Sequence, residues 1–205
     1  MKLKITEPEG VDPVAYMKDR GYVSYSSLKT FRDGGMIVKK TTDYFDFGTE
    51  LHSRFLEGRV TKRLAIKDEQ KIEAMLNALN SDALVKSIMK TKGVAFEQEL
   101  KVTIQGVPVL GYLDVKAPKL IADLKTTQHK SKTAFINSMD FLQAAVYISG
   151  TGIKDFYYIG ICKSEPHNVF TFNVKSYPDR MKTATIELNL LLKQIHEKRI
   201  FNKAD

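Results

Sequence analysis

The sequence predicts an α/β domain built on a mixed β-sheet, with helices before, between and after the strands. Two periodicities predict it. Apolar residues recur at every second position in some segments, which is typical of strands, and at every third or fourth position in others, which is typical of helices. We expect one domain over residues 1–205, with a mainly helical part over 1–92 and the core sheet and helices over 93–205.

The residues before the first strand are expected to form several helices. A short extended entry at Tyr22 leads into a helix that one of the following serines caps and that residues 33–35 (Asp-Gly-Gly) end. The helices predicted after it cover Gly48–Glu57, residues 67–79 and, with Ser81 as its N-cap, a short segment to about Thr91.

Three consecutive segments are predicted to be strands. Apolar and polar residues alternate from Phe96 to Ile104, which indicates a half-buried strand. A Gln105-Gly106 turn leads to the second strand, Val107–Val115, and a break at residues 117–119 leads to the third, Leu120–Thr127. Links this short join antiparallel neighbours, so we expect a three-stranded meander.

The rest of the chain returns to helix and then adds two strands. Glycines at positions 150 and 152 are expected to stop the helix that follows the meander. The predicted elements are a helix from Ser131 to about Ser149, strands Asp155–Cys162 and Val169–Val174, and a helix from about Pro178 to Lys198. We therefore expect a sheet of about five strands flanked by helices.

Composition limits the class of protein. A hydrophobic fraction of 43% is enough for a folded core, and no run approaches the roughly 20 apolar residues of a membrane span. The basic start lacks the apolar stretch of a signal peptide, and the single Cys162 excludes an internal disulfide and a cysteine zinc cluster. We expect a cytoplasmic protein of a bacterial or phage-infected cell. The net charge of +8 favours a polyanionic partner, although many basic proteins are simply soluble.

Two acids and a lysine carry the first sign of chemistry. Folding the chain as a hairpin about Pro118 places Asp114 nearly opposite Asp123, and cross-strand neighbours have Cβ atoms roughly 4.5–5.5 Å apart. Asp123 and Lys125 are two residues apart on one strand, so their side chains leave the same face. Mg²⁺ prefers carboxylate oxygens and would lower the pKa of a bound water. The alternative is a surface ion pair, since Asp-x-Lys is a common triplet.

Two helical features could complete such a site. His52 could supply a neutral imidazole to a metal, which would suit Mn²⁺ better than Mg²⁺, or could simply pack on its helix. Gln143 and Tyr147 are four residues apart and so share one helix face. They could hold a phosphate or support the metal site, or they could lie on a helix surface.

In this order, the motifs resemble those of the PD-(D/E)XK nuclease superfamily, in its RecB-like branch, and of the phage and prophage exodeoxyribonuclease VIII (RecE)-type exonucleases in particular. The resemblance spans about residues 22–150. The matching motifs are Ser24-Tyr-Ser26-Ser27-Leu28, Gly48-x-x-x-His52, Gly111-x-x-Asp114, Asp123-Leu-Lys125-Thr-Thr and Gln143-x-x-x-Tyr147.

The resemblance implies a restriction-endonuclease-like fold and a role for each motif. It implies Lys125 as the catalytic lysine and a glutamate from the preceding strand at the site, where Glu97 and Glu99 share the required parity and we favour Glu99. The implied metal ligands are His52, Asp114, Asp123 and the backbone carbonyl of Leu124. The residues implied to contact DNA or to line the site beside it are Gln143, Tyr147, Ser26 and Ser27.

The function that the resemblance implies is hydrolysis of DNA by a Mg²⁺-dependent exodeoxyribonuclease, with Mn²⁺ able to substitute. Double-stranded DNA ends would be the substrate, in phage-type recombination or repair, with a single-strand annealing protein as a possible partner and a homo-oligomer as a possible assembly. The alternatives are a flap or single-strand endonuclease, an inactive DNA-binding relative, and an unrelated mixed-sheet protein. Inactive relatives usually lose the second acid or the lysine, and here both remain.

Overall fold

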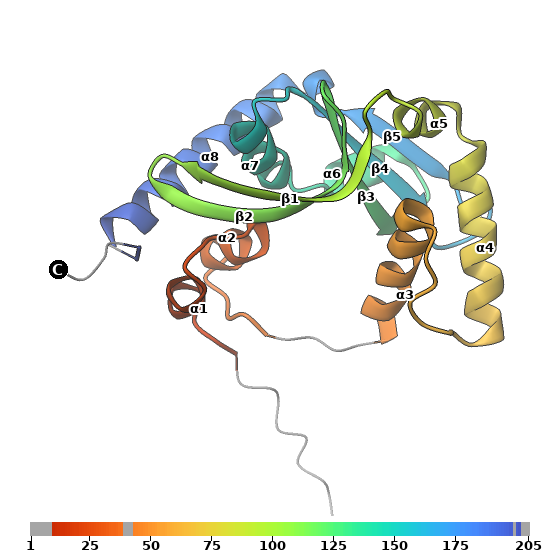
Figure 1. Ribbon diagram of the computed structural model, residues 1–205, viewed down its shortest axis with the longest axis horizontal. Coiled ribbons are helices and arrows are strands. Elements are labelled where there is room, and N and C mark those ends of the chain that lie inside the picture. Colours follow the sequence, from red (N-terminus) through yellow and green to blue (C-terminus); the bar gives the residue numbers. More distant parts are fainter. Residues whose placement is uncertain (1–9, 39–42, 199, 202–205) are drawn as a thin grey trace, which may run out of the picture.

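The computed structural model describes residues 10–38, 43–198 and 200–201. It has a five-stranded sheet in the order β1-β2-β3-β4-β5, with helices packed on both faces (Figure 1). The strands are β1 Ala95–Ile104, β2 Val107–Lys116, β3 Leu120–Thr127, β4 Asp155–Cys162 and β5 Val169–Asn173. The helices are α1 Pro13–Arg20, α2 Tyr25–Arg32, α3 Asp43–His52, the π-helix η1 Ser53–Glu57, α4 Ile66–Ser81, α5 Ala83–Met89, α6 Lys132–Ser138, α7 Phe141–Thr151, the 3₁₀ turn η2 Val174–Ser176 and α8 Pro178–Glu197.

The sheet is mixed, as the sequence predicts. The first three strands form the expected antiparallel meander, β4 pairs parallel to β3 along its whole length, and β5 pairs antiparallel to β4. Strands β2 and β3 pair only at Val115↔Ala122 and Lys116↔Ile121. Beyond these two pairs β2 leaves β3, and the β1–β2 hairpin extends as a long curved ribbon (Figure 1). The sheet therefore opens into a fork between β2 and β3.

Two hydrophobic clusters lie on opposite faces of the sheet. The larger one packs α1, α2, α6, α7 and α8 against the sheet through fully buried side chains such as Phe135 and Leu188. The smaller one packs α3, η1, α4 and α5 against it through Leu51 and Ile72. Burial of this apolar surface is the main force that holds the helices on the sheet. The fork between β2 and β3 opens beside α3, the helix that carries His52.

Several predicted helix boundaries are wrong, each because of a local cap. The predicted helix Ser131–Ser149 is two helices: Met139 is extended with ψ 133°, and Asp140 caps α7 by accepting the Leu142 N–H at 3.0 Å. The N-cap of α5 is Asp82 rather than Ser81, because its carboxylate accepts the Val85 N–H at 2.9 Å. Such caps satisfy backbone donors that a helix leaves free.

The first two helices also differ from expectation. Helix α1 was not predicted, although Asp12 caps it, Pro13 begins it and Gly21 ends it with φ 72°. The helix predicted to begin at Gly48 begins at Asp43 and continues beyond His52 as a π-helix that ends at Gly58 with φ 65°. The prediction that Ser24, Ser26 or Ser27 caps α2 is confirmed: Ser24 accepts the Ser27 N–H at 3.2 Å.

Within the described residues, no helix combines the length and apolar character that a membrane span needs.

Candidate active site

The fork between β2 and β3 brings the two predicted acids together. Continuing the register beyond Val115↔Ala122 puts Asp114 opposite Asp123, but the ladder ends there. In place of a ladder bond, Oδ2 of Asp114 accepts the backbone N–H of Leu124 at 2.7 Å. The turn at residues 117–119 thus sets the register that the sequence predicts, and the divergence of β2 leaves room between the strands.

Asp123 is buried and is held by two side chains. Only 2% of the residue is exposed, which is rare for a charged group. Its Oδ1 accepts the side-chain amide of Gln143 at 2.7 Å, and its Oδ2 lies 2.7 Å from Nζ of Lys125. Apart from this ionic contact, Oδ2 has no hydrogen bond from any described residue. A buried carboxylate oxygen whose lone pairs accept no hydrogen bond is suited to a cation.

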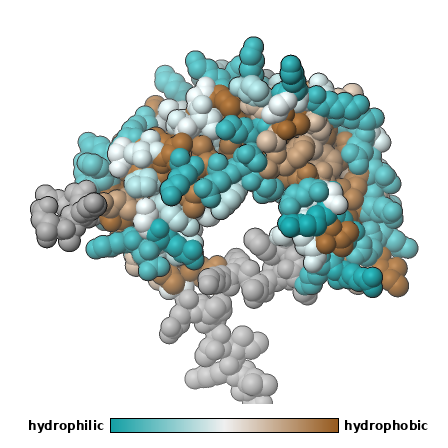
Figure 2. Space-filling model, in the orientation of Figure 1, coloured by the Kyte–Doolittle hydropathy of each residue, from teal (hydrophilic) through white to brown (hydrophobic). Residues whose placement is uncertain are grey.

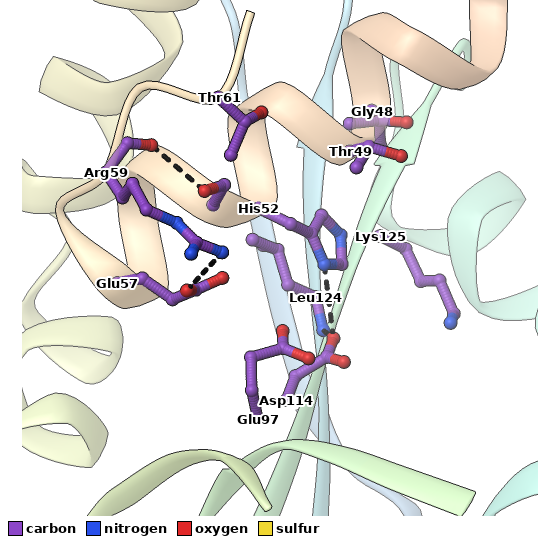
Figure 3. A pocket seen from close by; sticks show the side chains of 12 residues that line it. Gly48, Thr49, His52, Glu57, Arg59, Thr61, Glu97, Asp114, Leu124 and Lys125 are labelled. Carbon is purple, nitrogen blue, oxygen red and sulfur yellow. Dashed lines mark hydrogen bonds and ion pairs between the residues drawn. The ribbon is translucent and has the colours of Figure 1, made fainter.

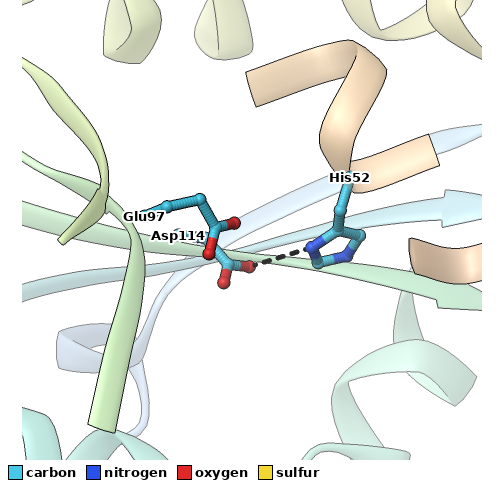
Figure 4. A group of neighbouring side chains, drawn as sticks. All are labelled: His52, Glu97 and Asp114. Atoms are coloured by element: carbon cyan, nitrogen blue, oxygen red, sulfur yellow. Dashed lines mark ion pairs between the residues drawn. The ribbon is translucent and has the colours of Figure 1, made fainter. Parts of the chain in front are cut away.

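Three side chains from different elements offer ligand atoms to one point. One atom each of His52, Glu97 and Asp114 lie within 4.8 Å of one another (Figure 4). The imidazole Nδ1 lies 3.6 Å from Oδ2 of Asp114. Two carboxylates and an imidazole form a donor set that fits Mn²⁺ and, less closely, Mg²⁺. The residues therefore fit a divalent cation, and the predicted ligand Asp123 is not one of the three.

The glutamate that the structure brings to this point is Glu97, whereas the favoured Glu99 lies elsewhere. Glu97 has φ 48° and is not among the residues of β1 that pair with β2, although its two neighbours are, at Phe96↔Val115 and Gln98↔Leu113. This left-handed conformation is unusual for glutamate and is often found at functional sites. Glu99 instead lies opposite Tyr112 and accepts its hydroxyl at 3.3 Å.

Mutual repulsion and burial shift the pKa values at this site. Burial, followed by the charge of Asp123, raises the pKa of Asp114 well above its ordinary value, and burial and neighbouring acids raise that of Glu97. Burial lowers the pKa of His52, which favours the neutral imidazole that binds metals. Burial alone would lower the pKa of Lys125, but Asp123 and Asp114 outweigh it and raise the pKa. A bound cation would relieve the repulsion between these acids.

The cluster lies in a pocket of about 560 Å³ between α3, the sheet and the segment after η1 (Figure 3). Arg59 and Thr61 come from that segment and were not among the predicted site residues. The Arg59 guanidinium lies 2.8 Å from the Glu57 carboxylate, and 64% of its side chain is exposed. A cation on the rim of an acidic pocket is suited to an incoming phosphate.

A buried glutamate fixes this rim. Glu50, 1% exposed, accepts the backbone N–H of Lys62 at 2.8 Å and that of Thr61 at 3.2 Å, and it also accepts the Thr61 hydroxyl. Nε of Arg54 lies 2.6 Å from the same carboxylate. The sequence offers only the four-residue spacing of Glu50 and Arg54 as a signal. The partners in the segment after η1 are not visible in that spacing, so Glu50 was missed.

The predicted pair on α7 is buried rather than on a helix surface. Gln143 and Tyr147 are each 6% exposed, so the alternative of a helix-surface pair is wrong. Gln143 reaches Asp123, and the Tyr147 ring lies against Gly111, where a Cβ would be 2.9 Å from the ring. Gly111 is therefore the close-contact position that lets the tyrosine pack behind β2.

The two predicted serines are not brought to the acids. Ser27 is 1% exposed and completes a capping box with Ser24, so it is not available to contact DNA. Ser26 is exposed, but its hydroxyl lies 2.9 Å from that of Ser24, beside a separate pocket. Leu124 does line the main pocket, and its N–H supports Asp114.

Comparison with solved structures finds one of the same fold and two that match more loosely. A candidate exonuclease from Eubacterium rectale is 19% identical, covers 92% of this chain and 84% of its own, and has a TM-score of 0.66. An alkaline exonuclease, LHK-Exo, from Laribacter hongkongensis is 14% identical over 91% of this chain and 95% of its own, with a TM-score of 0.40. A phage-related exonuclease from Haemophilus somnus 129PT is 12% identical over 93% and 96%, with a TM-score of 0.37. The last two overlay too loosely to support an argument.

A family profile covers most of the chain, whereas no curated protein matches it. Residues 35–200 match the family described as a PDDEXK-like domain of unknown function, DUF3799, and this range contains every residue of the cluster. The resemblance to PD-(D/E)XK nucleases and the mixed α/β fold are both confirmed. The chain therefore belongs to the PDDEXK-like family DUF3799.

Proposed function

We propose that this protein is a nuclease that hydrolyses DNA phosphodiester bonds with a divalent cation, Mg²⁺ or Mn²⁺. The observation that carries the proposal is the convergence of His52, Glu97 and Asp114 beside the buried Asp123–Lys125 pair. A metal-ligand set next to a lysine is what hydrolysis of a phosphodiester needs, since both water activation and charge neutralisation are required.

Each side chain has a role that its position supports. His52, Glu97 and Asp114 would hold the cation, with Asp123 at its side. When bound, the cation would lower the pKa of a water and neutralise charge on a phosphate oxygen. Lys125 is protonated and held by Asp123, so its Nζ can orient the attacking water and stabilise the negative charge of the transition state. Gln143 fixes the Asp123 carboxylate through Oδ1.

The finer assignment is an exodeoxyribonuclease acting on double-stranded ends, in phage-type recombination or repair. The motif resemblance supports it, and the net charge of +8 suits a polyanionic substrate. In that role the enzyme would pass single strands to an annealing protein and could act as a homo-oligomer. A flap or single-strand endonuclease is the alternative. The retained acids and lysine argue against an inactive relative.

End-labelled linear duplex incubated with Mg²⁺ tests the proposal. We expect cleavage that EDTA abolishes and that Asp123→Ala and Lys125→Ala each remove. Lys175→Ala is a matched control, because Lys175 also lies 2.7 Å from an aspartate, Asp155, but outside the pocket. Closed circular duplex in parallel separates the modes, since an exonuclease leaves it intact. Cleavage that survives both site substitutions would overturn the assignment.

A further inference from the structure

A second pocket, of about 290 Å³, lies between α1, the start of α2 and β2. Five of the nine residues that line it are tyrosines, and the whole chain has only nine. The lining tyrosines are Tyr16, Tyr22, Tyr25, Tyr112 and Tyr147. We propose that this tyrosine pocket binds a nucleobase of the DNA strand whose phosphate lies at the metal cluster, an inference that rests on the proposed nuclease function.

The rings are available for stacking. Tyr112 is 53% exposed, although large apolar rings are usually covered in a folded domain. Within the described part of the chain, Tyr16, Tyr22 and Tyr112 make no ring–ring contact, whereas the core aromatics pack ring against ring. A base has an aromatic face of its own and stacks on such rings without regard to sequence.

One of these rings is held in place. The Tyr112 hydroxyl donates to Glu99 across the β1–β2 hairpin at 3.3 Å, and the nearby charge raises the pKa of Tyr112. That hydrogen bond uses the edge of the ring and leaves its face free. Glu99, which the sequence suggested as a catalytic acid, would therefore act on substrate only by orienting Tyr112.

The tyrosine pocket is physically joined to the metal cluster. Tyr147 lines the tyrosine pocket, and Gln143, one helical turn away on α7, bonds to Asp123. On β2, Tyr112 precedes Asp114 by two residues, roughly 7 Å of strand at 3.4 Å per residue. A strand whose phosphate lies at the metal cluster can therefore place a nearby base, unstacked from the duplex, at the tyrosines.

The rim and the shape of the surface agree with a nucleic-acid ligand. The Arg20 guanidinium lies 5.4 Å above the Tyr16 ring, where a cation can meet a phosphate next to a stacked base. Figure 2 shows the described surface hollowed below β2, between the α1–α2 side and the α3 side. Five of the nine lining residues, Tyr16, Tyr22 and Tyr25 among them, precede residue 35, where the family match begins.

Abasic oligonucleotides test the inference directly. Affinity for an end-labelled strand is measured by fluorescence anisotropy in EDTA, with one base removed at a time. For the wild-type protein we expect one or two positions near the end where base removal weakens binding roughly five- to hundred-fold, the range for one stacked base. In Tyr112→Ala the same removal should cost nothing further, because the stacking partner is already absent. Tyr112→Phe should restore the penalty.

The controls separate this inference from the nuclease function. Leu190→Ala on α8, at a side chain 56% exposed, should leave the abasic profile unchanged. Circular dichroism must show that Tyr112→Ala is folded; if it is not, Tyr112→Leu, which keeps an apolar side chain but has no aromatic face, replaces it with the same expected result. An enzyme that cleaves DNA with Mg²⁺ but shows an unchanged abasic profile in the alanine variant overturns the tyrosine pocket alone. A wild-type protein that never cleaves overturns the proposed function instead.

Discussion

Replacing Glu97 by glutamine should weaken Mn²⁺ binding, whereas the same replacement at Glu99 should not. The two glutamates lie two residues apart on β1, so the pair differs in place and not in chemistry. Glu97 offers an oxygen to the group with His52 and Asp114, while Glu99 accepts the Tyr112 hydroxyl. The comparison therefore isolates the effect of the position of the carboxylate, in the group with His52 and Asp114 or outside it.

The expected magnitude comes from one lost charge. Two unit charges 4 Å apart interact by roughly 4 kcal/mol at an effective dielectric constant of about 20, and the double charge of Mn²⁺ raises this to roughly 8 kcal/mol. Glu97 is exposed to solvent, and glutamine keeps one oxygen donor, so we discount this energy to about a quarter. About 2 kcal/mol corresponds to roughly thirty-fold weaker binding.

Isothermal titration calorimetry with MnCl₂ on the wild type and both variants measures the difference. The predicted result is a dissociation constant raised roughly thirty-fold for Glu97→Gln and within about twofold of wild type for Glu99→Gln. Weaker binding by Glu99→Gln together with unchanged binding by Glu97→Gln would refute the reasoning.

Three further predictions concern the rim, the core and pH. Glu50→Ala should lower the free energy of unfolding by about 1–3 kcal/mol in urea titrations, because the backbone N–H groups of Thr61 and Lys62 lose their buried acceptor, while Arg54 keeps Glu69 as a partner. Gly160→Ala should cost about 1–3 kcal/mol in the same assay, since its Cβ would lie 2.5 Å from the buried Phe135 ring. Affinity for Mn²⁺ should rise with pH through the raised pKa of Asp114, since the bound proton must leave first; calorimetry in two buffers should show proton release, and a flat pH profile would contradict it. In the metal-free protein the raised pKa of Asp114 should also affect stability. The free energy of unfolding should fall as pH rises from 3.8, the ordinary aspartate pKa, through the raised pKa of Asp114.

The sequence predicts the parts of this molecule that local pattern determines. Alternation of apolar residues gives the three-stranded meander with nearly correct ends. The short link at residues 117–119 sets the register between Asp114 and Asp123, which is why the central acids and Lys125 could be named. These predictions succeed because each depends on residues close in sequence.

The parts that depend on long-range contacts or on one backbone angle could not be predicted. Side chains two residues apart on a strand share one face, so the sequence cannot distinguish Glu97 from Glu99. The φ of 48° at Glu97 distinguishes them in the structure. The role of Glu50 depends on the segment after η1 folding back on α3. Helix periodicity runs through Met139, but the cap at Asp140 breaks the helix there.

The most direct test of the central claim is to separate cleavage from metal binding at Lys125. Single-turnover cleavage of a linear duplex in saturating Mn²⁺ is measured for the wild type and for Lys125→Ala, together with the Mn²⁺ dissociation constant of each. If Lys125 stabilises the transition state, the substitution should slow cleavage by at least roughly a hundred-fold and leave metal binding no weaker. Equal cleavage rates for the two proteins, or a wild type that binds Mn²⁺ without cleaving DNA, would contradict the account.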